Sequence, residues 1–140
     1  METLATALVA VSVLTWLAVL LIPWRPWSSQ PFLDAQSDGG DLSDVTVLIP
    51  ARNEAAVIQK TLAALKSQGR NLSLVVVDDQ SADGTAELAR KAWADRLVVV
   101  AGAPLPSEWS GKLWALEQGR QYVETPLVLL TDADIELKPG

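Results

Sequence analysis

Two acidic residues near the end of the chain have the types and the spacing to bind a metal ion. Asp132 and Asp134 follow an apolar run in the segment LVLLTDAD. Two residues apart, they would point to the same side if the extended conformation continues through position 134. Carboxylate oxygens suit Mg²⁺ or Mn²⁺, and Mg²⁺ is usually held by one or two carboxylates together with substrate phosphates. We therefore predict a divalent cation at these residues; an acidic turn without a metal is the structural alternative.

A second acidic pair, Asp78 and Asp79, ends another apolar run in LVVVDDQSADGT. Neighbours in an extended segment point in opposite directions, so one carboxylate would face a ligand and the other would face the loop. We assign the ligand contact to Asp79. A carboxylate accepts hydrogen bonds from a nucleobase imide or a ribose hydroxyl but repels bare phosphate, so Asp79 suits a nucleoside and the metal suits a diphosphate. A carboxylate that only caps the next helix is the alternative.

The segment PARNE, residues 50–54, closes the first apolar run of the globular part. Pro50 fixes its own φ and helps the chain turn across the edge of a sheet. Asn53 can cap the helix that follows, and Arg52 or Glu54 can contact a nucleoside. Helix capping alone would account for most of this segment.

Lys112 is a candidate ligand for a diphosphate in the segment WSGKLWAL. Gly111 permits a close backbone approach, and Lys112 falls in the first turn of a predicted helix, where anions are favoured. A solvated surface lysine is the alternative. Trp109 and Trp114 could frame a pocket beside it, although Trp114 is equally suited to the core.

The elements that must position these residues alternate regularly along the chain. Short apolar runs at residues 45–49, 72–77, 97–101 and 127–130 predict strands, and the segments between them carry helical patterns, the third from about 112 to 122. Such alternation predicts an α/β fold with a Rossmann-like parallel sheet covered on both faces. Right-handed crossovers would bring the carboxyl ends of all the strands, and the polar clusters that follow them, to one edge.

Composition limits the chemistry that is available. The 140 residues suit about one domain, and the chain has no cysteine and no histidine, so disulfides, thiolate metal sites and a histidine base are excluded. The net charge of -6 argues against nucleic acid as a partner, because phosphate binding needs clustered lysine and arginine.

The N-terminal segment has the composition of a membrane span. Residues 4–22 carry no charge, and a helix of that length extends about 29 Å, close to a hydrocarbon core of about 30 Å. We predict a transmembrane helix in residues 1–24, a linker in 25–44 and a globular domain in 45–140. A cleaved signal peptide and a buried core helix are the alternatives. Arg25, between Trp24 and Trp27, favours a single pass through the plasma (inner) membrane with the soluble part in the cytoplasm.

The four segments VTVLIPARNEAAVI, LVVVDDQSADGT, EWSGKLWAL and LVLLTDAD together resemble family 2 glycosyltransferases of the GT-A fold, and most of all the membrane-anchored hopene-associated glycosyltransferases of bacterial hopanoid gene clusters. The resemblance implies transfer of a sugar from a nucleoside diphosphate donor, a UDP-sugar, to an acceptor of lipid or hopanoid type. It also implies site roles: Asp79 for the base, Asp132 for the ribose or the metal, Asp134 for the metal, Pro50, Ala51 and Glu54 for the nucleoside wall, and Lys112 as a further donor contact.

Members of that family continue into a second half that carries the acceptor site and a general base. This chain ends at Gly140, so we expect the donor-binding half alone, without transferase activity, and a base beyond Gly140. A truncated, noncatalytic fragment that binds nucleotide and metal is one alternative. A receiver-like Mg²⁺-binding signalling module is another, although its acidic pair would follow the first strand, where this chain has PARNE.

Overall fold

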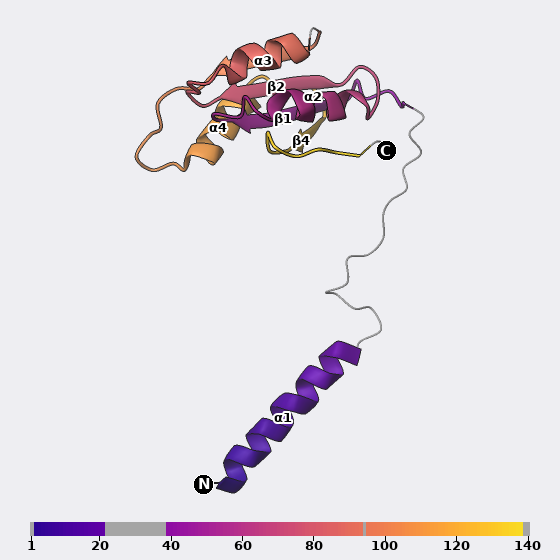
Figure 1. The fold of residues 1–140 in the computed structure, drawn as a ribbon, viewed down its shortest axis with the longest axis vertical. Coiled ribbons are helices and arrows are strands. Elements are labelled where there is room, and N and C mark those ends of the chain that lie inside the picture. Colours follow the sequence, from indigo (N-terminus) through magenta and orange to yellow (C-terminus); the bar gives the residue numbers. More distant parts are fainter. Residues whose placement is uncertain (1, 22–38, 94, 139–140) are drawn as a thin grey trace. The chain divides into compact units, whose positions relative to one another are not determined.

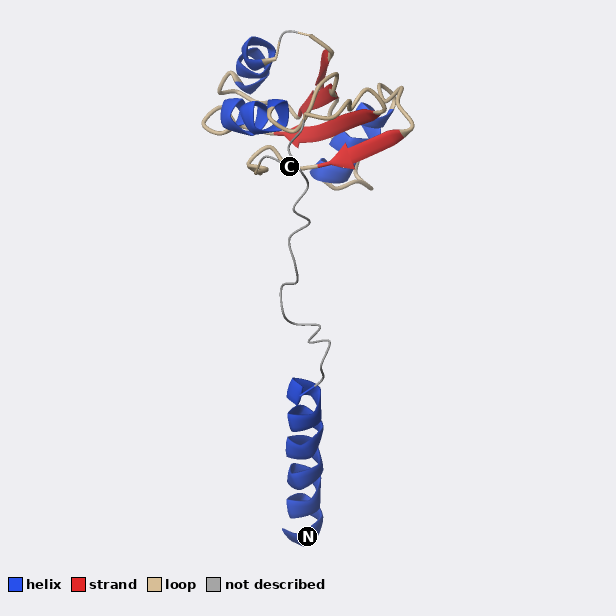
Figure 2. Cartoon of the chain, turned by 90° about the vertical axis from the view of Figure 1, so that its right-hand side faces the viewer, coloured by secondary structure: helices blue, strands red, loops and turns tan. Residues whose placement is uncertain are grey.

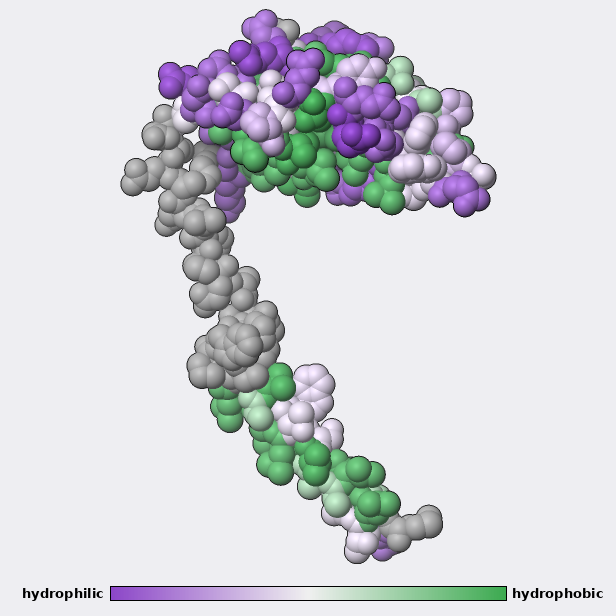
Figure 3. All heavy atoms as spheres, turned by 180° about the vertical axis from the view of Figure 1, so that it is seen from behind, coloured by the Kyte–Doolittle hydropathy of each residue, from purple (hydrophilic) through white to green (hydrophobic). Residues whose placement is uncertain are grey.

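The computed structural model describes residues 2–21, 39–93 and 95–138, which belong to two separate units (Figure 1). The first unit is the helix α1, Glu2–Leu21, in which no residue is buried. It is long and apolar enough to cross a membrane, and its surface is largely apolar (Figure 3). The hydroxyls of Thr6 and Thr15 donate to carbonyls one turn earlier, so these polar side chains are satisfied within the helix. Trp24 at the end of the predicted membrane segment, and most of the predicted linker with Arg25 and Trp27, lie outside the described residues.

The second unit is a four-stranded parallel sheet with helices on both faces, as predicted (Figure 2). The strands are β1 (Val45–Ala51), β2 (Ser73–Asp78), β3 (Leu97–Ala101) and β4 (Leu127–Leu130), in the order β3-β2-β1-β4. At the carboxyl edge, Ala51 of β1 lies opposite Asp78, and Asp78 lies opposite Ala101 of β3. The segments that follow these strands therefore begin side by side.

The two central strands are largely apolar because both of their faces are covered. Alternate residues of β1 and β2, among them Ile49 and Val76, pack under the helices α2 (Ile58–Lys66) and α3 (Thr85–Ala92). Leu48, Val75 and Val77 point to the other face, where α4 (Gly111–Arg120) covers them. Because alternate residues of a strand point to opposite faces, each apolar run contributes to two cores, one on each side of the sheet.

The outer strand β4 departs from the prediction of a sheet covered on both faces. Its four residues are 41–59% exposed. The apolar run LVLL predicts a covered strand, but β4 pairs only with β1 among the described strands, and α4 lies over β1 and β2 rather than over β4. These residues contribute to the apolar surface on one side of the domain (Figure 3).

Candidate functional site

A cavity of about 400 Å³ opens at the carboxyl edge of the sheet. Pockets that bind small molecules usually measure about 300–1,000 Å³. The seven residues to which the sequence analysis assigns donor or metal binding all line it: Pro50, Ala51, Glu54, Asp79, Lys112, Asp132 and Asp134. Its walls thus come from the end of β1, the loop after β2, the start of α4 and the segment after β4.

The two carboxylates after β4 reach this cavity by a turn rather than along a strand. β4 ends at Leu130, and the Ile135 amide approaches the Asp132 carbonyl at 3.4 Å, so the extended conformation does not continue to position 134. Tertiary contact explains the turn: Ala133 is buried, and its carbonyl accepts a hydrogen bond from the Thr61 hydroxyl of α2 at 2.6 Å. The acidic residues on either side of Ala133 nevertheless both line the cavity.

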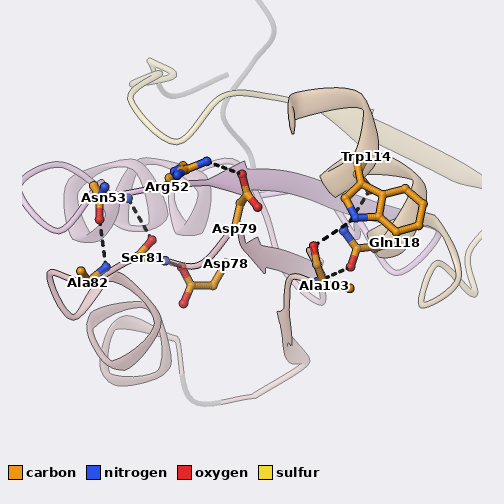
Figure 4. A network of polar contacts seen from close by, with 9 residues as sticks. All are labelled: Arg52, Asn53, Asp78, Asp79, Ser81, Ala82, Ala103, Trp114 and Gln118. Atoms are coloured by element: carbon orange, nitrogen blue, oxygen red, sulfur yellow. Dashed lines mark hydrogen bonds and ion pairs between the residues drawn. The ribbon is translucent and has the colours of Figure 1, made fainter. Parts of the chain in front are cut away.

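The carboxylates of Asp78 and Asp79 diverge at the end of β2 (Figure 4). Asp79 is largely buried in the cavity wall, and its Oδ2 lies 3.4 Å from a guanidinium nitrogen of Arg52. Asp78 turns to the loop, where its Oδ1 accepts a hydrogen bond from the Ser81 amide at 3.2 Å. The structure therefore places Asp79, and not Asp78, where a ligand can meet it.

The loops that follow β1 and β2 are joined by side-chain hydrogen bonds (Figure 4). The Asn53 amide donates to the Ser81 hydroxyl, and the Asn53 side-chain oxygen accepts from the Ala82 amide, both at 2.9 Å. The Glu54 amide donates to the buried Thr85 hydroxyl, also at 2.9 Å. Helix capping by Asn53 is therefore a wrong prediction. Its φ of 55° lies in the left-handed region that asparagine tolerates, and α2 begins only at Ile58.

Asp83 completes this connection between the two loops. Its Oδ2 accepts a hydrogen bond from the Ala55 amide at 2.9 Å, and its Oδ1 accepts from the hydroxyl and the amide of Thr85 at the start of α3. These hydrogen bonds, with that from the Thr85 hydroxyl the strongest, lower the pKa of the Asp83 carboxyl below its ordinary value. The ionised form of Asp83 thus joins the loop after β1 to the start of α3.

Lys112 lies in the first turn of α4 and forms an ion pair inside the cavity. Its Nζ is 2.5 Å from Oδ1 of Asp132, and the two side chains are 60% and 49% exposed. The structure therefore brings the predicted diphosphate contact and a predicted metal ligand together. Both remain accessible to solvent and to a ligand.

Trp109 and Trp114 do not line this cavity. Their ring centroids are 5.4 Å apart, and the Trp114 indole N–H donates to the Ala103 carbonyl at 3.1 Å. Gln118 accepts a hydrogen bond from the Ala103 amide at 2.6 Å. Through Trp114 and Gln118, α4 holds the start of the loop between β3 and α4 at Ala103 (Figure 4). This loop leads to Gly111 and Lys112.

The cavity fits a divalent cation that is completed by its substrate. Within residues 39–93 and 95–138, no group of three or more histidine, cysteine, aspartate or glutamate side chains could by itself hold a metal ion. Asp132 and Asp134 offer carboxylate oxygens only, which suits Mg²⁺ or Mn²⁺. Such an ion usually keeps several sites for water and substrate phosphates, so two carboxylates at the rim of an open cavity match this chemistry.

Part of this chain is similar in sequence to known proteins. Residues 46–140 match the family model described as Glycosyl transferase family 2. A 4,4'-diaponeurosporenoate glycosyltransferase of Staphylococcus haemolyticus is 35% identical over 104 residues, which cover 74% of this chain and 28% of that protein. An undecaprenyl-phosphate 4-deoxy-4-formamido-L-arabinose transferase of Edwardsiella ictaluri is 34% identical over 107 residues, 74% of this chain and 33% of that protein.

Solved structures share the fold. The mannosyltransferase PcManGT of Pyrobaculum calidifontis, in complex with GDP-Man and Mn²⁺, superposes with a TM-score of 0.58 at 29% identity, over 90% of this chain and 38% of that one. Glucosyl-3-phosphoglycerate synthase of Mycobacterium tuberculosis superposes with a TM-score of 0.52 at 24% identity, over 68% of this chain and 35% of that one. The expected likeness to GT-A structures is therefore confirmed.

The chain spans about a third of the length of each of these proteins. The match to the family model nevertheless takes in almost all of the described α/β domain, from β1 to the acidic turn after β4. The chain therefore belongs to the family 2 glycosyl transferases.

Proposed function

We propose that this chain is the donor-binding part of a metal-dependent glycosyltransferase that takes a sugar from a nucleoside diphosphate, with UDP as the nucleotide. The observation that carries the proposal is the convergence of Asp79, the basic side chain of Lys112 and the carboxylates of Asp132 and Asp134 on one cavity. The mannosyltransferase with GDP-Man and Mn²⁺ supports a nucleotide sugar and a divalent ion as the ligands.

The proposed roles follow the geometry of the cavity. Asp79, largely buried at the end of β2, accepts hydrogen bonds from the nucleobase, and Pro50, Ala51 and Glu54 form the wall beside it. Lys112 at the start of α4 contacts the diphosphate.

Asp132 and Asp134 hold Mg²⁺ or Mn²⁺ on the turn after β4, and Asp132 can also reach the ribose. When bound, the cation offsets the charge that develops on the leaving diphosphate. We place the general base beyond Gly140, so residues 39–138 are expected to bind the donor without transferring sugar. The greater length of the relatives supports this division.

We further propose a lipid acceptor of hopanoid type at the inner membrane, with α1 as a single-pass anchor and the α/β domain in the cytoplasm. The name of the undecaprenyl-phosphate transferase points to a lipid acceptor in one relative, and α1 has the length and composition of a membrane span. Alkaline extraction should leave the chain in the membrane fraction. Protease should digest the domain in inverted vesicles and spare it in intact spheroplasts; the opposite pattern would overturn the orientation.

Calorimetric titration of the full chain in detergent micelles tests the donor site. UDP should bind in the presence of Mn²⁺, and chelation by EDTA should abolish the heat. Asp134→Asn should weaken this binding by about tenfold or more, because it removes one charged ligand of the metal.

The matched control is Glu136→Gln, which removes a carboxylate two residues further on. Glu136 pairs with Lys60 at 2.7 Å and does not line the cavity, so UDP binding should not change. A parallel titration with GDP tests the choice of nucleotide. UDP binding that is unaffected by EDTA, or that Glu136→Gln weakens as much as Asp134→Asn does, would contradict the proposal.

A further inference from the structure

Each carboxylate that we assign to the base or the ribose side of the donor already has a basic partner in the cavity. Arg52 lies 3.4 Å from Asp79, and Lys112 lies 2.5 Å from Asp132. The second contact is the closer one, and it involves the carboxylate that we also assign to the metal. The lysine occupies Oδ1, one of the two carboxylate oxygens through which Asp132 could bind a metal ion, and its positive charge opposes a cation at the other.

We propose that Lys112 and the divalent cation compete for Asp132, and that Lys112 transfers its ion pair from Asp132 to the diphosphate when the metal binds. This inference rests on the proposed function, because it takes the same cavity as a site for metal and nucleoside diphosphate. The exchange gives Lys112 a role beyond its contact with the diphosphate. Through its ion pair with Asp132, Lys112 makes metal binding and nucleotide binding depend on each other.

The charges in the cavity make the exchange favourable only when both ligands are present. A divalent ion on Asp132 takes up the carboxylate charge and repels the ammonium of Lys112. A diphosphate then offers that ammonium new anionic oxygens. The lysine side chain is a compact charge on a flexible stem, and at 60% exposure it can change partners without leaving water.

The exchange predicts opposite effects of one substitution on the two ligands. Lys112→Met removes the competitor, so Mn²⁺ alone should bind the variant more tightly, by about two- to fivefold, the range expected for an exposed ion pair. The same variant loses a charged contact to the diphosphate, so UDP should bind about tenfold more weakly at saturating Mn²⁺. A lysine that only contacts phosphate would leave the affinity for Mn²⁺ alone unchanged.

Reciprocity supplies a second readout from the same titrations. The factor by which Mn²⁺ improves UDP binding equals the factor by which UDP improves Mn²⁺ binding, whichever residue couples the ligands, so a contribution of Lys112 enters both factors. Both factors should be smaller in Lys112→Met than in the wild type. Lys112→Arg keeps the charge and should keep most of the coupling.

The experiment uses the full chain in detergent micelles, with free Mn²⁺ followed by electron paramagnetic resonance and UDP binding followed by calorimetry. Lys60→Met is the first control, because the Lys60–Glu136 pair is similarly exposed but lies away from the cavity residues. Arg52→Met is the second control, because it removes a positive charge from the same cavity without touching Asp132. Tighter binding of Mn²⁺ to Lys112→Met alone supports the exchange.

Three results would overturn the exchange while UDP binding stays intact: equal Mn²⁺ affinity of Lys112→Met and the wild type, an equal gain in Arg52→Met, or no Mn²⁺ binding by either chain without nucleotide. Failure of the proposed function would look different. In that case neither UDP nor GDP would bind the wild type at saturating Mn²⁺, and the inference would fall with it.

Discussion

The hydrogen bond from Thr61 to the Ala133 carbonyl should control the shape of the acidic turn. Thr61→Val keeps the size and the β-branching of the side chain but replaces the hydroxyl with a methyl group. Thr61 and Ala133 are 2% and 3% exposed, so water cannot easily replace the lost donor. At 2.6 Å this contact ties α2 to the segment that carries both proposed metal ligands.

The expected magnitude follows from this burial. Leaving a buried carbonyl without its donor costs about 1–3 kcal/mol, and the free energy of unfolding should fall by that amount. If the turn loosens and must re-form when metal and nucleotide bind, the affinity for UDP in Mn²⁺ should also fall. The same energy sets an upper limit of about 5- to 150-fold on that loss.

Urea unfolding followed by circular dichroism measures the first quantity, and calorimetric titration of UDP in Mn²⁺ measures the second. Thr46→Val is the matched control. Thr46 is also 2% exposed, and its hydroxyl lies 2.7 Å from that of Thr125, but this pair is near the amino edge of the sheet, away from the cavity. This variant should lose about 1 kcal/mol of stability and bind UDP normally.

Loss of stability in Thr61→Val with UDP binding as tight as that of the wild type would show that the turn keeps its shape without the hydrogen bond, and would refute this role of Thr61. Equal losses of binding in the two threonine variants would also refute it, since the effect would then reflect general destabilisation.

Two further predictions concern stability. Gly119→Ala should lower the free energy of unfolding in urea, because the added Cβ would overlap Leu48 and lie 2.7 Å from Val77 Cγ2. Such overpacking costs about 1–3 kcal/mol, which is more than the gain of up to about 1 kcal/mol from the higher helix propensity of alanine. An unchanged midpoint would show that α4 can move away from the sheet. Asp83 should make stability depend on pH, because hydrogen bonds, chiefly from Thr85, lower the pKa of its carboxyl in the folded state. The contribution of Asp83 to the free energy of unfolding is therefore present above the ordinary pKa of 3.8 and is lost as the pH falls through the lower pKa of the folded state. Urea midpoints between about pH 6 and about pH 3 should therefore fall less steeply in Asp83→Asn than in the wild type.

Strand positions could be predicted from the sequence because apolar runs and their ends are local signals. The runs at residues 97–101 and 127–130 match β3 and β4, and Asp79 and Asp134 follow their strands into a common cavity. The topology of a parallel sheet accounts for this success, since it brings all carboxyl ends to one edge whatever the details of the loops.

The remaining features depend on tertiary contacts that no local pattern encodes. Asn53 suits a helix cap as well as a left-handed loop residue, and only the neighbouring loop decides between them. The turn at residues 132–134 depends on Thr61, which in the sequence looks like any residue on the buried face of a helix. The exposure of LVLL depends on what lies over it, and an apolar run does not reveal that.

The exposure of β4 also bears on how the isolated polypeptide behaves in solution. An outer strand of four aliphatic residues exposes unpaired backbone groups and an apolar surface, to which another copy of the chain can bind. Self-association would compete with every equilibrium discussed above and would grow with concentration. Dilute samples, checked for monodispersity before each titration, are therefore a condition for interpreting the affinities.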